Sequence, residues 1–216
     1  MHPGKAERSE DFVRRIPLSR RSHVTGFQVL PGGITEHESA LERDFVTLAT
    51  FTDPNAKVTS QPVTIAFRDG GMARRYTPDF LVHWSSGHSE LVEIKYRSDL
   101  REHWKQLRPA FIAARDWCEE HDAWFRIATE RSIRCPRLAN AKRLLPLRTA
   151  YLDPAAAQEV SRTVASLSDP TLARLAAAVP VDRAVALGAI WRMIARGALR
   201  MDLAVPIGMD APVALP

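Results

Sequence analysis

The first helical pattern of apolar residues covers residues 35–50. A threonine at its start, Thr35, can cap the helix, because Glu38 follows three residues later as in a capping box. A break at residues 53–55, Asp-Pro-Asn, ends the pattern. The expected buried face carries Leu41, Phe45 and Leu48.

Strand-like patterns follow at residues 63–67, 74–84 and 90–96, separated by glycine-rich turns. Tight turns between such runs predict an antiparallel meander. A long helix is expected at residues 100–120, and a fourth strand at residues 123–129. A strand that returns through a helix usually lies parallel to its neighbour, so residues 34–130 predict an α/β core.

The rest of the chain changes character. A basic connector at residues 131–148 precedes alanine-rich helices at residues 154–167, 170–178 and 181–196, of which Ser168 or Asp169 would cap the second. A short strand is expected at residues 199–205. Three short helices followed by a β-segment indicate a winged-helix-like module. The predicted organisation is therefore a basic N-terminal arm at 1–33, an α/β domain at 34–150 and this module at 151–216.

The composition is that of an ordinary globular protein, with 45% hydrophobic and 25% charged residues. The net charge of +5 favours a polyanionic partner, nucleic acid first and an anionic membrane second. No apolar run approaches the ~20 residues that span a bilayer, and no apolar segment follows the N-terminal arginines as in a signal peptide. The two cysteines, Cys118 and Cys135, have no histidines at zinc-finger spacing. We therefore expect a cytoplasmic protein with ordinary thiols and no membrane partner.

The residues that suggest chemistry lie on two neighbouring predicted strands. Glu93 and Lys95 point to the same face of one strand, because side chains alternate, while Ile94 points into the core. The hairpin can bring Asp79 opposite that pair. Carboxylate oxygens and a backbone carbonyl, here that of Ile94, suit Mg²⁺, which can activate water for phosphodiester hydrolysis. Lys95 would orient the water and stabilise the developing negative charge.

A fourth group is expected from the first helix. Glu42 flanks the buried face, and Glu38, one turn earlier, is the competing candidate. A Glu-x-Lys pair alone is more typical of a solvated surface, where ion pairs are common and weak. The ordered combination of Glu42, Asp79, Glu93 and Lys95 favours the functional interpretation.

Several motifs in this order resemble the PD-(D/E)xK nuclease superfamily and, more narrowly, TnsA, the endonuclease subunit of heteromeric transposases. They are SALERDF at 39–45, QP at 61–62, YTPDF at 76–80, EIK at 93–95 and FRIATE at 125–130. The resemblance covers residues 34–130 well and the C-terminal module more loosely. It implies a restriction-endonuclease-like mixed sheet flanked by helices, with Glu42, Asp79 and Lys95 in the active site. Some members carry Gln at the position of Glu93.

The resemblance also implies an activity and partners. It implies Mg²⁺-dependent cleavage of double-stranded DNA at the 5′ ends of a transposon, with Mn²⁺ as a substitute. A TnsB-like DDE transposase would cut the other strand, and a TnsC-like ATPase would bind the C-terminal module. A basic cluster in the connector is expected to hold the DNA backbone: Arg131, Arg134, Arg137, Lys142 and Arg143.

Two other functions remain open at this point. The chain could be a stand-alone restriction-like or repair nuclease of the same fold, which would cut DNA without partners. It could also be a non-catalytic DNA-binding assembly subunit that uses the C-terminal module. The presence of all four candidate residues ranks this last hypothesis lowest.

Overall fold

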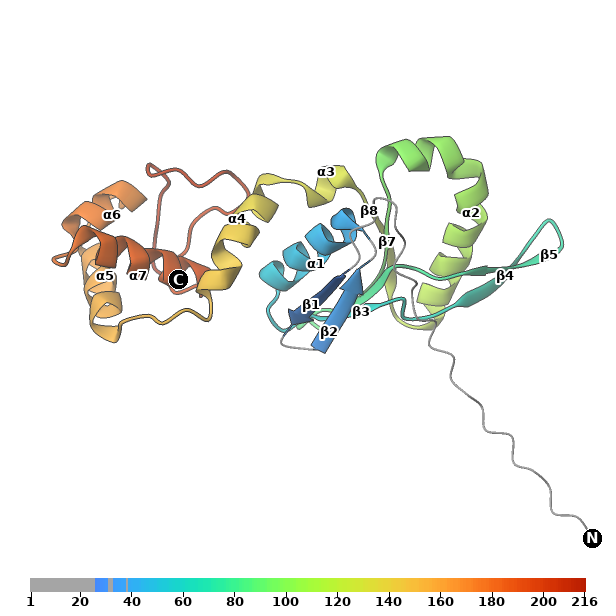
Figure 1. Ribbon diagram of the computed structural model, residues 1–216, viewed down its shortest axis with the longest axis horizontal. Coiled ribbons are helices and arrows are strands. Elements are labelled where there is room, and N and C mark those ends of the chain that lie inside the picture. Colours follow the sequence, from blue (N-terminus) through green and yellow to red (C-terminus); the bar gives the residue numbers. More distant parts are fainter. Residues whose placement is uncertain (1–25, 31–32, 38) are drawn as a thin grey trace, which may run out of the picture.

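The computed structural model describes residues 26–30, 33–37 and 39–216. Figure 1 shows an α/β part and a helical C-terminal part lying side by side along the long axis. The strands are β1 (Gly26–Leu30), β2 (Gly33–His37), β3 (Lys57–Ser60), β4 (Ile65–Asp69), β5 (Met72–Tyr76), β6 (Phe80–His83), β7 (Ser89–Ile94) and β8 (Trp124–Ala128). The helices are α1 (Ala40–Thr52), α2 (Arg97–Glu120), α3 (Glu130–Ile133), α4 (Pro136–Leu144), the 3-10 turn η1 (Leu145–Leu147), α5 (Pro154–Ser166), α6 (Leu172–Ala178) and α7 (Arg183–Ala195).

The central sheet has four strands in the order β3-β6-β7-β8. Its β3–β6 and β6–β7 pairs are antiparallel, and β7–β8 is parallel. The helix-linked return strand is therefore parallel, as predicted. The sequence analysis missed β3, which is short and only half-buried on alternate positions. The sheet is mixed, and helices flank it.

The predicted strand at 74–84 is wrong, because Thr77-Pro78 divides it. A proline lacks the N–H that a continuous ladder requires. The first half becomes β5, which pairs with β4 in a separate two-stranded sheet. Gly70 and Gly71 turn this hairpin with φ of 56° and 85°, a backbone region that glycine favours. The second half becomes β6 of the central sheet, so the predicted single meander is two hairpins.

Helix α1 begins later than predicted. Thr35 lies in β2, which pairs with β1 from Gly33 to His37, so it is not the cap. Ser39 caps the helix instead, since its side chain accepts from the Glu42 amide. Glu38 lies outside the described residues, as does most of the predicted N-terminal arm, residues 1–25. Gly26–Leu30 of that arm forms β1.

Both faces of the central sheet are buried. On the α1 face, Phe45 stacks on Phe80 within a core that includes Val82, Val92 and Ile94. On the α2 face, Leu91 packs against Ala114 and Cys118, with Ile65 from the β4–β5 hairpin. Because alternate residues of β7 serve opposite cores, the orientation of every side chain on that strand is fixed.

The C-terminal part consists of three helices around their own core. Thr171 and Asp182 cap α6 and α7, so the predicted caps Ser168 and Asp169 are wrong. The predicted strand at 199–205 does not form. Among the described residues, this region has two isolated bridges, at Arg200–Ala214 and Thr171–Pro212. The segment with Pro206 and Pro212 has too few donors for a ladder, and the winged-helix prediction is not confirmed.

The predicted connector is helical and joins the two parts. Ala141 and Leu144 of α4 pack in the C-terminal core, and so does Phe51 of α1. Arg148 donates hydrogen bonds to the carbonyls of Thr50, Phe51 and Ala195, so it binds α1 to α7. Both cysteines are free thiols. No helix in the described part of the chain has the length and apolar character needed to cross a membrane.

Candidate active site

A buried glutamate on β7 is the centre of the candidate site. Glu93 is 3% exposed. Its Oε1 lies 2.7 Å from Lys95 Nζ, and its Oε2 accepts a 2.6 Å hydrogen bond from the Tyr76 hydroxyl. Lys95 follows at the end of β7 on the same side, as strand alternation predicts. A buried carboxylate with both oxygens held in this way is locked in one orientation.

Asp79 lies directly before β6, beside the end of β7. Its Oδ2 accepts a 2.6 Å hydrogen bond from the Ile94 amide, while its carbonyl accepts from the Gln61 amide at 2.8 Å. The hairpin thus brings Asp79 opposite the Glu93–Lys95 pair. The β4–β5 ladder ends at Tyr76, and Pro78, two residues later, cannot extend it because it has no backbone N–H.

The site concentrates negative charge. Burial, then repulsion from Glu93, raises the pKa of Asp79 to about 8, although Lys95 and the Ile94 amide act in the opposite direction. Burial alone would lower the pKa of Lys95, but the charges of Glu93, Asp79 and Glu42 outweigh it and raise that pKa. Burial and the adjacent Glu93 also raise the pKa of Tyr76. Lys95 is therefore a cation and Tyr76 a neutral donor at neutral pH.

Glu42 comes from the first turn of α1. The Ser39 hydroxyl donates to Glu42 Oε1 at 2.8 Å, so the residue that caps the helix also orients this carboxylate. Glu42 is half-buried. Its charge raises the pKa of both Asp79 and Lys95. Glu42 is therefore within electrostatic reach of the cluster formed by Asp79, Glu93 and Lys95; the catalytic roles of all four stay predictions.

The residue that the sequence analysis missed is Tyr76. It is the last residue of β5, in register with Ile65, and its ring packs edge-on against Phe111 of α2. Its place at the head of the YTPDF motif was the available signal, but a strand tyrosine is also a common core residue. Only the three-dimensional structure shows that its hydroxyl binds Glu93.

The basic cluster of the connector has internal partners. Asp44 of α1, 4% exposed, lies 3.2 Å from Arg134 Nε and 2.5 Å from Lys142 Nζ. The guanidinium of Arg143 lies 3.9 Å from the centre of the Trp191 ring, and that of Arg137 lies over Phe51. Arg131 is exposed. The predicted DNA contacts of these residues stay predictions, and four of the five contact an acidic or aromatic side chain of the chain itself.

The donors at the site suit a hard divalent cation. Repulsion from Glu93 and Glu42 helps to raise the pKa of Asp79, and a bound cation would relieve it. Each carboxylate oxygen can accept more than one bond. Within the described ranges, no three acidic, histidine or cysteine side chains already form a metal cage. Ile94 contacts Asp79 through its amide; a role for its carbonyl as a ligand stays a prediction. The chemistry of Asp79 and Glu93 suits a metal, and Glu42 is a further carboxylate within electrostatic reach.

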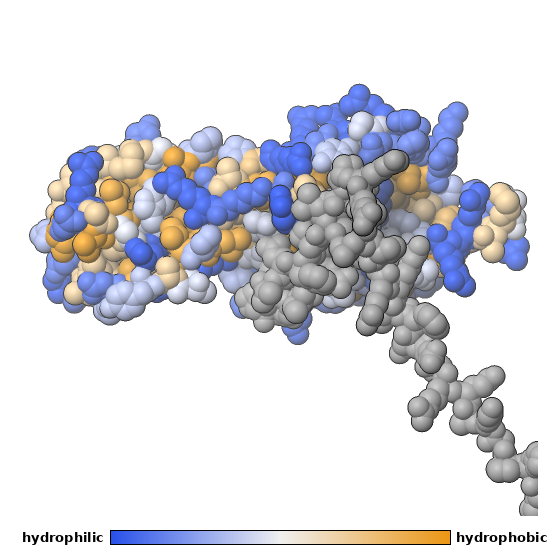
Figure 2. Space-filling view, in the orientation of Figure 1, coloured by the Kyte–Doolittle hydropathy of each residue, from blue (hydrophilic) through white to orange (hydrophobic). Residues whose placement is uncertain are grey.

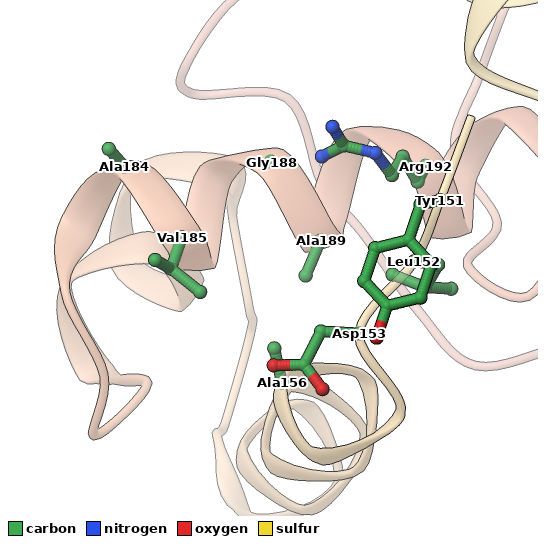
Figure 3. Close-up of a pocket in the computed structure, with 9 residues that line it drawn as sticks. All are labelled: Tyr151, Leu152, Asp153, Ala156, Ala184, Val185, Gly188, Ala189 and Arg192. Atoms are coloured by element: carbon green, nitrogen blue, oxygen red, sulfur yellow. The ribbon is translucent and has the colours of Figure 1, made fainter.

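A separate hollow lies in the C-terminal part, away from these carboxylates (Figure 3). Its volume is about 370 Å³. The lining combines Ala184, Gly188 and Ala189 of α7 with Ala156, Tyr151 and Arg192. Asp153 also lines the hollow, and its carboxylate accepts a hydrogen bond from the Ala155 amide as the cap of α5.

The fold and the carboxylate cluster point to a class, the α/β nuclease domains. A mixed sheet that gathers two carboxylates and a lysine at adjacent strand ends suits phosphodiester hydrolysis. Residues 56–130 match the family model described as "TnsA-like endonuclease N terminal". The match covers about a third of the chain, and it supports a TnsA-like endonuclease assignment for this segment. The segment contains Asp79, Glu93 and Lys95, whereas Glu42 and the C-terminal part lie outside it. A comparison with curated proteins finds no match.

Proposed function

We propose that this chain is the metal-dependent DNA endonuclease of a TnsA-like transposase, and that it cleaves the 5′ ends of a transposon during cut-and-paste transposition. The observation that carries the proposal is the buried Glu93, held between Lys95 and Tyr76 with Asp79 alongside. This cluster lies inside the segment that matches the TnsA-like family.

Asp79, Glu93 and Glu42 would hold Mg²⁺ or Mn²⁺, with the Ile94 carbonyl as a further oxygen ligand. Such an ion polarises the phosphodiester and lowers the pKa of a bound water. Lys95 orients the attacking water and stabilises the charge that develops on the phosphate oxygens. Tyr76 does not touch the substrate. Its hydroxyl keeps the Glu93 carboxylate in place, as hydrogen-bond partners of metal ligands do.

The proposed partners follow from the family. A TnsB-like DDE transposase would cut the complementary strand, and a TnsC-like ATPase would dock on the C-terminal part, for which a winged-helix-like role in binding DNA or protein is proposed. The cluster at Arg131, Arg134, Arg137, Lys142 and Arg143 is a proposed DNA contact in addition to its structural role. Dependence on partners would protect the host from unregulated cleavage.

The test is cleavage of a plasmid that carries transposon ends, with Mg²⁺, in the presence and absence of the partner transposase. Wild-type protein should cut the 5′ ends only with its partner, and Asp79→Asn protein should not cut while still joining the complex. Full double-strand excision by Asp79→Asn protein would overturn the proposal. Efficient cutting by the purified chain alone would instead favour a stand-alone nuclease.

A further inference from the structure

Exposed basic residues without ion pairs line one side of α2. In its first half, Arg97, Arg101, Lys105 and Arg108 occur at i, i+4, i+8 and i+11. With 3.6 residues per turn, this spacing places all four on one side of the helix. All four are exposed, and within the described residues none of their side chains takes part in an ion pair.

The acids of this half of α2 are engaged elsewhere. Asp99 accepts a hydrogen bond from Ser98, and Glu102 pairs with His103. Near the helix start, Glu130 binds the amide of Arg97 and not its guanidinium. The four basic residues, called the α2 track below, therefore keep their positive charge. This contrasts with the connector cluster, where Asp44 neutralises Arg134 and Lys142.

The α2 track starts beside the candidate active site. Arg97 follows Lys95 by two residues. From there the first half of α2 runs across the top of the domain before the helix turns down, and Pro109 accounts for the bend (Figure 1). Hydrophilic side chains cover this top surface in Figure 2. The charge thus forms a continuous track that leads away from Lys95.

The dimensions of the track fit a nucleic-acid backbone. Eleven residues from Arg97 to Arg108 rise about 16 Å at ~1.5 Å each. One strand of a duplex places a phosphate every ~3.4 Å along the axis, so the track faces about five phosphates. The apolar side of α2 is partly buried, with Phe111 and Ala114 in the core, and its exposed large apolar side chains are Trp104 and Ile112, each 45% exposed. Two half-exposed side chains do not form the continuous apolar face that a helix inserted into a membrane surface requires.

We propose that Arg97, Arg101, Lys105 and Arg108 bind the phosphate backbone of the DNA next to the scissile bond, and so position the duplex over Glu93 and Lys95. This inference rests on the proposed function, because it names the surface that holds the substrate. The contacts are to phosphates. They provide affinity and register without sequence preference.

The test is equilibrium binding of the full chain to a short duplex without metal, over a range of salt concentrations. The variant is Arg101→Ala/Lys105→Ala, at the middle of the track. Each phosphate contact contributes about 0.9 to the slope of log binding constant against log salt, so losing two should lower the slope by about 1.8. The charge-retaining Arg101→Lys/Lys105→Arg variant should keep the wild-type slope.

The matched control is Lys57→Ala/Arg126→Ala, which also removes two positive charges, but at positions outside α2. Lys57 starts β3 at the end away from Asp79, and Arg126 is already paired with Glu90. This control should bind as wild type does. An unchanged slope for Arg101→Ala/Lys105→Ala, an equal loss in the control, or a loss in the charge-retaining variant would each overturn the proposal. A loss of binding to phosphatidylserine vesicles with DNA binding intact would also overturn it.

The outcomes separate this proposal from the proposed function. If wild type cleaves DNA but the α2 variant keeps its salt slope, the track is wrong and the nuclease assignment stands. If the α2 variant loses slope but no cleavage occurs with Mg²⁺ and partners, the track stands and the nuclease assignment fails.

Discussion

The Tyr76 hydroxyl donates a 2.6 Å hydrogen bond to Oε2 of Glu93, across seventeen positions of sequence and from a different sheet. This hydrogen bond links the β4–β5 hairpin to β7, the strand that carries Glu93. Because Lys95 holds the other oxygen, the carboxylate cannot rotate without breaking one of two charge-assisted contacts. The geometry of the site therefore depends on a residue that need not touch the substrate.

Tyr76→Phe should lower both stability and metal affinity. The ring still fills its place against Phe111, but a buried carboxylate loses a donor, which costs about 1.5–3 kcal/mol. Urea unfolding measures the first effect. The Mg²⁺ concentration for half-maximal cleavage measures the second, and it should rise by about 10-fold or more, as second-shell losses do. An unchanged Mg²⁺ requirement would show that Tyr76 has only a packing role.

Asp79→Asn should abolish cleavage without destabilising the metal-free protein. The pKa of Asp79, about 8, lies above its ordinary value of 3.8, so the folded state holds the proton more tightly. The stability that Asp79 contributes is therefore complete below about pH 4 and lost as the pH rises to about 8. Asparagine does not ionise, so the Asp79→Asn variant does not lose stability in this way as the pH rises. It should be more stable than wild type at alkaline pH, by as much as about 5 kcal/mol, and equal to it in acid.

Thermal melts at several pH values, in a chelator, give this comparison. Added Mg²⁺ should then stabilise wild type and leave the variant unchanged, because only a state with the ligand set intact gains from binding. A pH-independent difference between the two proteins would contradict the proposed electrostatics.

Lys95→Ala should reduce the cleavage rate by about 100-fold or more, the usual effect of removing one group that stabilises developing charge. Metal-free DNA binding should change little, because Lys95 is half-buried against Glu93 rather than part of the α2 track. Single-turnover rates and the duplex-binding assay separate the two. Lys57→Ala is the control, and it should keep wild-type activity.

Asp44→Ala should destabilise the protein more than it affects cleavage. It leaves Arg134 and Lys142 without their buried acceptor and loosens α4 from α1. Breaking a buried pair costs about 3–5 kcal/mol, and the half-exposed state of the two cations reduces this to about 2 kcal/mol. Chemical denaturation measures the loss. If stability is unchanged and DNA binding rises, the connector cations that Asp44 neutralises serve DNA and not the fold.

Local patterns along the chain predicted most elements of the α/β part. The alternation at Glu93-Ile94-Lys95 predicted that Ile94 packs in the core while Glu93 and Lys95 share the other face, and the helix between β7 and β8 predicted their parallel pairing. The proximity of Asp79, Glu93 and Lys95 could be predicted because a hairpin with a short turn brings them together. The hydrogen bond of Tyr76 to Glu93 could not be predicted, because it depends on how two separate sheets pack.

The errors have similar causes. Thr35 fits a cap by spacing alone, but pairing with β1 removes it from the helix, and Ser39 takes that position. Asp44 sits in a stretch of charged residues whose pattern does not show which one is buried. Its buried position decides that Arg134 and Lys142 face a carboxylate. In both cases a tertiary contact overrides a local preference.

Phe51 belongs to α1, yet its ring lies in the core of the C-terminal helices, beneath the guanidinium groups of Arg137 and Arg148. A polypeptide cut after residue 150 would leave that ring facing water and would deprive the last three helices of one wall. In the intact chain, the α/β part and the C-terminal part should therefore unfold together in one thermal transition. An exchange of C-terminal halves between relatives would succeed only if the end of α1 were transplanted with them.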